Sequence, residues 1–182
     1  ISSGDAALAR AMEAIAQLLN RRADSLLTRI DILDLANWLG TVLSSRRSAE
    51  IAIFEYGEDE WAEFAVAKKG IGPGNNVQRY QSNNSLLSSK KPLRSELEHI
   101  FALMVDAGGS EPGFINAESA RKRAPWFKGC NPCVEILLGN KSFCNLTETD
   151  LGKFKGDSAG LRRAITIASR ANYRQTCVNL QD

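Results

Sequence analysis

The sequence predicts a mixed α/β fold, because segments with the three-to-four-residue spacing of amphipathic helices alternate with short apolar stretches typical of strands. The chain has 182 residues, which is enough for a domain with its own hydrophobic core. We expect helices at residues 5–19, 31–43, 58–68, 94–107, 118–123 and 158–171, and strands at 49–54, 114–116 and 134–138.

The first two helices are predicted from periodicity alone. In the range 5–19, apolar residues recur every three or four positions, and Ser3 and Asp5 are candidate caps. The range 31–43 has the same spacing of apolar residues. This pattern indicates two helices packed on each other, and by itself it points to no catalytic or binding function. The apolar face predicted for the first helix comprises Ala6, Leu8, Ala9, Met12, Ile15, Ala16 and Leu19.

The range 49–54 alternates apolar and other residues, with Ala49, Ile51 and Ile53 on one face, which predicts a half-buried strand. Arg46 and Arg47 stand just before it. Paired arginines can bind phosphate, but arginines on a protein surface are more often only solvated. Both interpretations of this pair stay open.

The range 94–107 has strong helical periodicity, and Gly108–Gly109 marks its end. A last helix is expected at 158–171, and Cys177 beyond it is interpreted as a buried structural thiol. The residues expected to point inward from the helix at 94–107 are Leu97, Ile100, Phe101, Met104 and Val105.

Asn131, Cys133 and Glu135 stand at every second position, so an extended chain would project all three side chains to one side. The apolar run 136–138 follows and would bury this small polar volume beside a core. Cys144 comes eleven residues after Cys133, beyond a Gly-Asn turn signal that could bring the second thiol close. An amide and a carboxylate aimed at one point suit a sugar with vicinal hydroxyls.

Cys130 and Cys133 also form a Cys-x-x-Cys pair, which could be a redox dithiol or half of a zinc site. A zinc site would need two more ligands, and the chain offers one histidine, His99, together with Cys144 and Cys177. From residue types alone, these alternatives stay open.

The polar set resembles the active site of ribonucleotide reductases, in which an Asn-x-Cys-x-Glu segment sits on a loop inside a ten-stranded α/β barrel. The resemblance implies that Cys133, as a thiyl radical, abstracts hydrogen from the ribose 3′ carbon. It assigns Asn131 and Glu135 to binding the ribose hydroxyls and moving protons as the 2′ hydroxyl leaves as water. Cys144 matches one of two cysteines that supply reducing electrons. Its short spacing from Cys133 is most similar to the class II, adenosylcobalamin-dependent branch.

The same resemblance implies binding of a ribonucleotide substrate and a nucleotide effector. The Gly-rich range 69–79 fits neither common phosphate-binding motif, but it resembles the family's specificity loop, in which Gln78 and Arg79 are candidates for base contacts. Ser82 and Asn83 belong to a polar cluster that resembles a class II segment entering a barrel strand. They are further candidates for the substrate and effector side.

The resemblance divides the chain into residues 1–43, helices of a subunit interface and effector side, and residues 44–182, a partial barrel with the cysteine loop. It implies a homodimer. No cysteine upstream of this loop is present to pair with Cys144, and we find no later phosphate-binding segment and no C-terminal Cys pair, so we expect a central fragment that is inactive without the missing remainder of the reductase. Cys130 departs from the family pattern, which leaves open a nonproductive disulfide with Cys133.

A competing hypothesis is a non-catalytic nucleotide-binding or regulatory module that keeps the fold. The intact Cys133 and Cys144 favour catalysis, because a pure binding module has no use for a thiol pair.

Composition bears on partners and compartment. Lys and Arg number 23 against 21 Asp and Glu, which gives no electrostatic case for nucleic-acid binding. Four cysteines without a signal peptide or a long apolar run predict a reduced, cytoplasmic protein with no membrane segment. We expect no bound metal.

Overall fold

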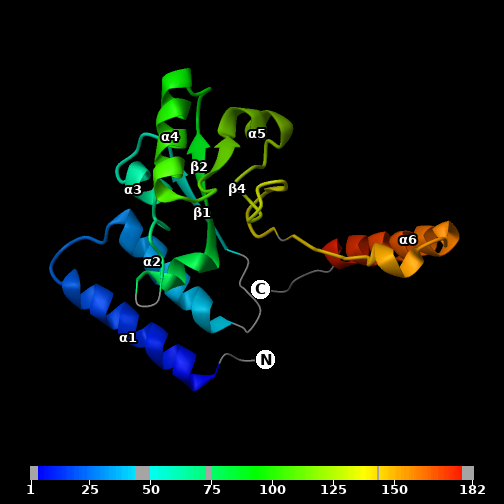
Figure 1. Ribbon diagram of the computed structural model, residues 1–182, viewed down its shortest axis with the longest axis horizontal. Helices are drawn as coiled ribbons and strands as arrows, with labels where there is room; N and C mark the ends of the chain where they lie inside the picture. Colours follow the sequence, from blue (N-terminus) through cyan, green and yellow to red (C-terminus); the bar gives the residue numbers. More distant parts are fainter. Residues whose placement is uncertain (1–3, 44–49, 73–74, 143, 178–182) are drawn as a thin grey trace. The chain divides into compact units, whose positions relative to one another are not determined.

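The computed structural model describes residues 4–43, 50–72, 75–142 and 144–177 (Figure 1). Contacts between residues divide the chain into unit 1, residues 1–140, and unit 2, residues 141–182. Several sequence predictions lie outside the described residues, namely the candidate cap Ser3, the phosphate site at Arg46 and Arg47, the first residue of the predicted strand at Ala49, and Pro73–Gly74 of the Gly-rich range.

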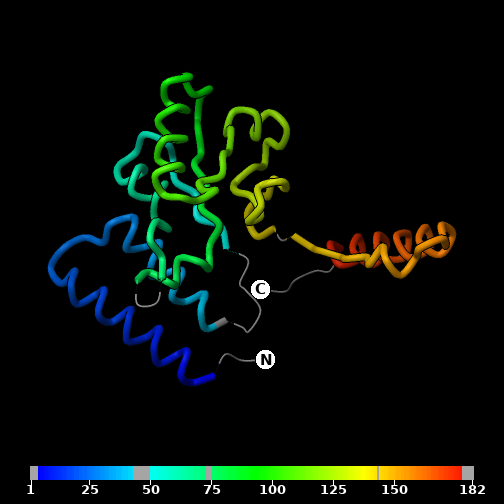
Figure 2. The backbone as a smooth tube through the Cα atoms, in the orientation of Figure 1, coloured from blue at the N-terminus to red at the C-terminus, as the bar shows by residue number. Residues whose placement is uncertain are grey.

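Unit 1 is built on a parallel sheet of three strands in the order β1 (Glu50–Glu55), β2 (Ser82–Ser88) and β3 (Gly113–Asn116). The chain passes from β1 to β2 through α3 (Trp61–Ala65) and the 3₁₀ turn η1 (Val77–Gln81), and from β2 to β3 through α4 (Arg94–Ala107) (Figure 2). Parallel strands need such crossovers, because the chain must return to the same end of the sheet. The predicted mixed α/β class is confirmed.

Both faces of the sheet are packed. Phe54 of β1 stacks on Phe64 of α3, with ring centroids 3.9 Å apart, in a first core shared with α4. Ile53 of β1 and Leu87 of β2 pack in a second core with residues of α5 (Ala117–Arg123). Figure 1 shows α3 and α4 on one side of the sheet and α5 on the other. The expectation of one apolar face on β1 is wrong, because a parallel sheet between helices buries both.

The N-terminal helices form as predicted, as α1 (Asp5–Arg21) and α2 (Arg29–Leu43), and they pack on each other. The buried residues of α1 are Ala11 and Leu18. The small side chain of Ala11 lets the two helices approach closely. The predicted apolar face of α1 is therefore wrong in phase. Its large members are exposed, at 49% for Leu8, 53% for Met12 and 46% for Leu19.

Helix α4 ends at Gly108, whose φ of 68° is the left-handed conformation that favours glycine. Ile100 is 1% exposed and anchors the helix in the first core. Phe101 and Val105, expected to point inward, are instead 49% and 80% exposed, because only a narrow stripe of α4 meets the sheet. The Phe101 ring meets Phe114 edge to face, with centroids 5.8 Å apart.

Unit 2 holds the short turn η2 (Leu151–Phe154) and α6 (Ser158–Thr176), which runs five residues beyond the predicted end. The Asp157 side chain caps α6 by accepting from the Gly160 backbone N–H at 2.8 Å. Cys177 at the end of α6 is exposed, so the prediction of a buried structural thiol is wrong. Among the described residues of α6, none is fully buried.

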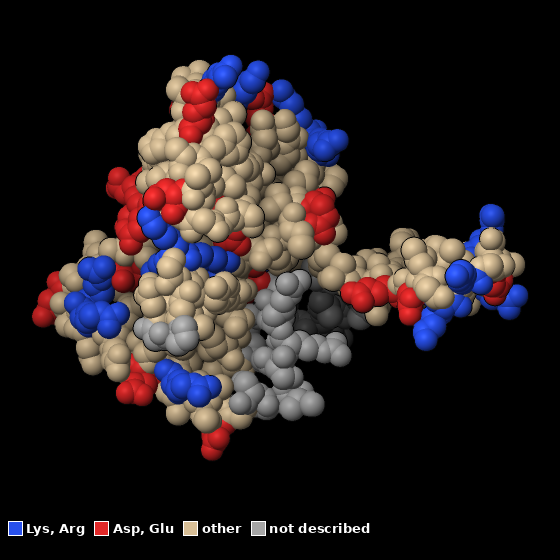
Figure 3. Space-filling view, viewed as in Figure 1, with Lys and Arg blue, Asp and Glu red and all other residues tan. Residues whose placement is uncertain are grey.

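Charges of both signs are interspersed over the face of unit 1 that Figure 3 shows. This mixture accords with the small net charge of +2. Among the described helices, none combines the length and the apolar character needed to cross a membrane.

Candidate functional site

The candidate site is the tip of a small hairpin in unit 1. Strand β4 (Gly129–Cys130) pairs antiparallel with β5 (Leu137–Leu138), and residues 131–136 form the turn between them. The strand predicted at 134–138 is thus reduced to two residues. Its extent was wrong because Val134 has a φ of 71°, which turns the chain back on itself.

The Asn131 side chain holds this turn together. Asn131 is 5% exposed, and its Oδ1 accepts a hydrogen bond from the Ile136 backbone N–H at 2.9 Å. Its Nδ2 donates to Oε1 of Glu135 at 2.6 Å. A side-chain amide can do both, since one end accepts and the other donates. Asn131 and Glu135 therefore do come together, through a tight turn and not through alternation along an extended strand.

Cys133 lies in the same turn, and its side chain is exposed. The backbone on each side of it is fixed, because the Val134 N–H donates to the Asn131 carbonyl at 2.9 Å. A thiol in this position can be approached by a reactant from outside the hairpin.

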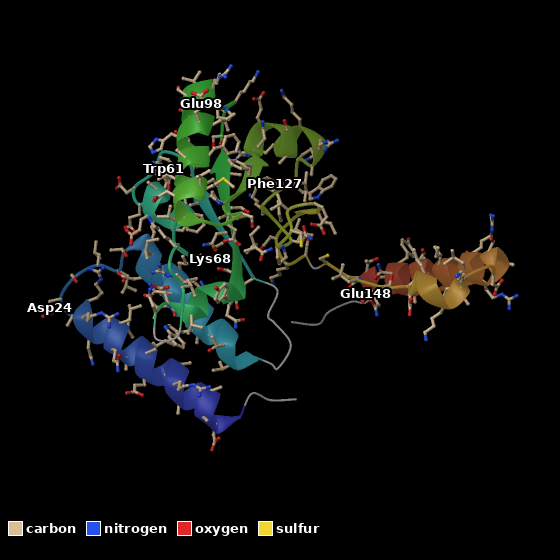
Figure 4. The ribbon with its side chains drawn as sticks, in the orientation of Figure 1. Asp24, Trp61, Lys68, Glu98, Phe127 and Glu148 are labelled. Atoms are coloured by element: carbon tan, nitrogen blue, oxygen red, sulfur yellow. The ribbon has the colours of Figure 1, made fainter. Side chains whose placement is uncertain are left out.

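Cys130 has a different environment from Cys133. It is 5% exposed and packs in the second core with Phe127, which Figure 4 labels. Burial raises the pKa of the Cys130 thiol, and the nearby negative charge of Glu135 adds to the rise. All four cysteines are free thiols, so the structure contains no Cys130–Cys133 disulfide. The Cys130 side chain is therefore part of the hydrophobic core.

Of the two candidates at the start of β2, Asn83 lies beside the cysteine turn. Its Nδ2 donates to the Pro132 carbonyl oxygen at 3.0 Å. Ser82 is 2% exposed; its hydroxyl donates to Oδ1 of Asn84 at 2.9 Å, and its carbonyl accepts from Lys68. Neighbouring strand residues face opposite sides of a sheet, so only Asn83 belongs to the cysteine side.

Gln78 and Arg79 are turned into the protein. Arg79 is 9% exposed and donates from Nε and Nη2 to the two carboxylate oxygens of Asp34, each at 2.7 Å. Gln78 donates to the same carboxylate at 2.8 Å, and Arg79 also donates to the Ala67 carbonyl at 2.8 Å. Their predicted contact with a nucleotide base stays a prediction, and it requires release from Asp34.

Cys144 belongs to unit 2 and is half-buried. Its predicted approach to Cys133, in unit 1, stays a prediction. Within the described ranges, no group of three or more His, Cys, Asp or Glu residues is arranged to hold a metal ion. The zinc alternative therefore finds no ligand set in that part of the chain.

Sequence reasoning missed Asp34, the partner of Arg79, and an ion pair at 2.8 Å between Lys68 and Glu111. Lys68, which Figure 4 labels, and Glu111 border a cavity of about 320 Å³ on the α3 and α4 side of the sheet. No residue of the cysteine turn lines this cavity. No local motif marked either pair, because the partners are 45 and 43 residues apart.

Comparison with known proteins finds relatives among curated sequences of one kind of enzyme. No protein-family model and no solved structure matches the chain. The curated relatives include adenosylcobalamin-dependent ribonucleoside-triphosphate reductases of Lacticaseibacillus paracasei, 30% identical over 189 residues, and of Lactobacillus gasseri, 29% identical over 194 residues. The enzyme of the same name from Lactobacillus leichmannii is 26% identical over 194 residues.

Each of these matches covers 96% of this chain but only 24% of the relative. The chain thus spans about a quarter of the length of the curated relatives it matches. Over nearly its whole length it is similar to one segment of these reductases, which confirms the resemblance inferred from the cysteine loop.

Proposed function

We propose that the chain is the segment of an adenosylcobalamin-dependent ribonucleotide reductase that presents the reactive cysteine to the ribose. The observation that carries this proposal is the turn 131–136. In this turn the Asn131 amide donates a hydrogen bond to the Glu135 carboxylate at 2.6 Å, and the Cys133 thiol is exposed. The similarity to reductases over 96% of the chain supports it. The activity belongs to the complete reductase, because the chain spans 24% of such proteins.

In the proposed reaction, the Cys133 thiyl radical removes the hydrogen atom from C3′ of the ribose, which restores the thiol and leaves the radical on the sugar. Adenosylcobalamin would supply the radical that takes the thiol hydrogen. The exposure of Cys133 fits this chemistry, since both the radical source and the substrate must reach the sulfur. We assign no residue of this chain to holding the cofactor itself.

Glu135 and Asn131 would handle the ribose hydroxyls. Asn131 binds Oε1 of Glu135, and within the described part of the chain nothing binds Oε2. That oxygen can take the proton of the 3′ hydroxyl. Asn131 has a second N–H on Nδ2, which can donate to a ribose oxygen while the first keeps Glu135 in place.

Cys144 would supply reducing electrons together with a second cysteine from the remainder of the reductase. Two thiols lose one hydrogen atom each as they join in a disulfide. The C2′–O bond breaks, a C2′–H bond forms, and the oxygen leaves as water. This step requires Cys144 to reach the same ribose as Cys133.

The scaffold supports a place within a ten-stranded barrel. Its three parallel strands are packed on both faces, and β1 and β3 are the edges of the described sheet. We propose that further strands from the missing remainder continue this sheet, and that α1 and α2 form the homodimer interface. In this arrangement Gln78 and Arg79 would contact a nucleotide base after leaving Asp34.

The test is deoxyribonucleotide formation by the complete reductase with adenosylcobalamin, a dithiol, and ribonucleoside di- or triphosphates. We expect Cys133→Ser to abolish the activity, because a hydroxyl cannot replace the thiol as a source of a workable radical. Cys177→Ser is the matched control, since Cys177 is also exposed and lies in unit 2, outside the turn. The isolated chain should form no product. A complete protein that binds nucleotides but reduces none would favour the regulatory module.

A further inference from the structure

We infer that Asn83 is a positioning residue for Cys133, and that it acts by holding the peptide group that precedes the cysteine. This inference rests on the proposed function and adds a residue to it. Its basis is one contact between distant parts of unit 1: Nδ2 of Asn83 donates to the Pro132 carbonyl at 3.0 Å, across 49 residues of sequence.

The Pro132 carbonyl belongs to the peptide bond that joins Pro132 to Cys133. A peptide group is planar, so fixing its oxygen also fixes the direction of the Cys133 N–H and limits where the Cys133 side chain can point. Proline contributes to the same end, because its ring restricts φ of residue 132. Asn83 therefore acts on the residue next to the thiol without needing to touch the sulfur.

Within the described part of the chain, the other hydrogen bonds of the turn are internal to it. Asn131 accepts from Ile136 and Val134, and it donates to Glu135. These bonds define the shape of the turn but do not attach it to the sheet. The Asn83 contact does, because Asn83 lies in β2, the central strand, opposite Ile51 of β1.

A radical transfer depends on the position of the sulfur to within a fraction of an ångström, and loose placement lowers the rate of the chemical step more than the affinity for substrate. Loss of the Asn83 bond should therefore lower kcat and leave KM nearly unchanged. A residue that contacts the substrate base would change KM first. Measuring kcat and KM therefore distinguishes a role of Asn83 in positioning Cys133 from a role in binding the base.

The first experiment uses the 182-residue chain and does not depend on catalysis. Residue-resolved amide hydrogen exchange is measured for the native sequence, for Asn83→Ala and for Asn83→Asp, which keeps the size but removes the donor. We expect exchange at Val134 and Ile136 to rise roughly 3- to 10-fold, the effect of losing one neutral hydrogen bond. Amides of α4 should not change, which separates local release from global unfolding.

Ser89→Ala is the matched control. Ser89 follows the opposite end of β2, is exposed, and donates a hydrogen bond to Glu55 of β1. Its removal should leave exchange at Val134 and Ile136 as it was. Equal exchange in Asn83→Ala and in the native chain would overturn the inference.

The second experiment measures kcat and KM of the complete reductase carrying the same changes. We expect kcat to fall roughly 3- to 10-fold with KM within about twofold. Asn83→Gln, which keeps the donor on a longer side chain, should recover part of the loss. A rise in KM at constant kcat would overturn the positioning role. If Cys133→Ser retained activity, the proposed function would fail, while the exchange experiment would still report whether Asn83 anchors the turn.

Discussion

Arg79 and Asp34 form a buried, two-pronged ion pair that ties the turn η1 to helix α2. The Nε and Nη2 donors of Arg79 each lie 2.7 Å from a different oxygen of Asp34, and the two side chains are 10% and 13% exposed. Planar guanidinium and carboxylate groups match in this geometry, which makes it one of the stronger polar contacts available to a protein. The pair therefore fixes where the Gly-rich segment rejoins the sheet.

Breaking this pair should destabilise unit 1. We expect Asp34→Ala to lower the free energy of unfolding by about 3 kcal/mol, because it leaves the Arg79 guanidinium buried without its anionic partner. Urea denaturation of the 182-residue chain measures the change. Glu98→Ala is the control, since the Glu98 pair with Arg94 is exposed, and its loss should cost less than about 0.5 kcal/mol. Equal costs for the two changes would contradict the structural role given to Asp34.

Cys130 should make the stability of unit 1 depend on alkaline pH. Burial raises the pKa of this thiol in the folded chain, so the folded state keeps a proton that the unfolded state loses first. The stabilisation is complete below the ordinary thiol pKa and is lost as the pH rises through the folded pKa. Urea midpoints measured from neutral to alkaline pH should fall, and they should fall less for Cys130→Ala. An identical slope for both proteins would exclude Cys130 as the source.

Thiol labelling gives an independent check on the two cysteines of the Cys-x-x-Cys pair. In the native chain, iodoacetamide should label Cys133 well before Cys130, because Cys133 is exposed and Cys130 is both buried and protonated. Mass spectrometry of peptides measures the order. In concentrated urea the two rates should become similar, and a difference that persisted there would count against burial as the cause.

The bond between Asn131 and Glu135 can be tested by exchanging donor and acceptor. Asn131→Asp places two carboxylates together and should destabilise the turn, whereas Asn131→Asp with Glu135→Gln restores one donor and one acceptor. We expect a coupling free energy of about 1 kcal/mol in a double-mutant cycle, a modest value because Glu135 is exposed. Urea denaturation of the four proteins provides the cycle. Simple additivity would show that the contact does not stabilise the chain.

Most of the helices were predictable from the sequence, since the spacing of apolar residues determines which segments are amphipathic. The central strand β2 was not among the predicted strands, because its first residues are polar and look turn-like by themselves. Which face of a helix is buried was harder to predict. In α1 the buried stripe runs through Ala11 and not through Met12, because packing against a second helix can favour a small side chain over a large one. The sequence alone does not say which face meets the neighbour.

The composition of the site was predictable, but its geometry was not. Asn131 and Glu135 were expected to meet along an extended strand, and they meet because the amide closes a turn in which Val134 has a positive φ. The contact of Asn83 with Pro132 joins residues 49 positions apart, and no local pattern reports such a pairing. The packing of the β4–β5 hairpin on the three-stranded sheet brings these two residues together.

The exposed apolar face of α1 should make the isolated chain associate with itself. Leu8 and Met12 are 49% and 53% exposed one turn apart, whereas the buried residues of the same helix are Ala11 and Leu18, so a second molecule can cover the exposed pair. Sedimentation velocity should show dimers or larger species, and Leu8→Lys with Met12→Lys should shift the chain toward monomer. Leu151→Lys removes an equally large exposed side chain from unit 2 and should leave association unchanged. A chain that sediments as a monomer at high concentration would refute association through α1.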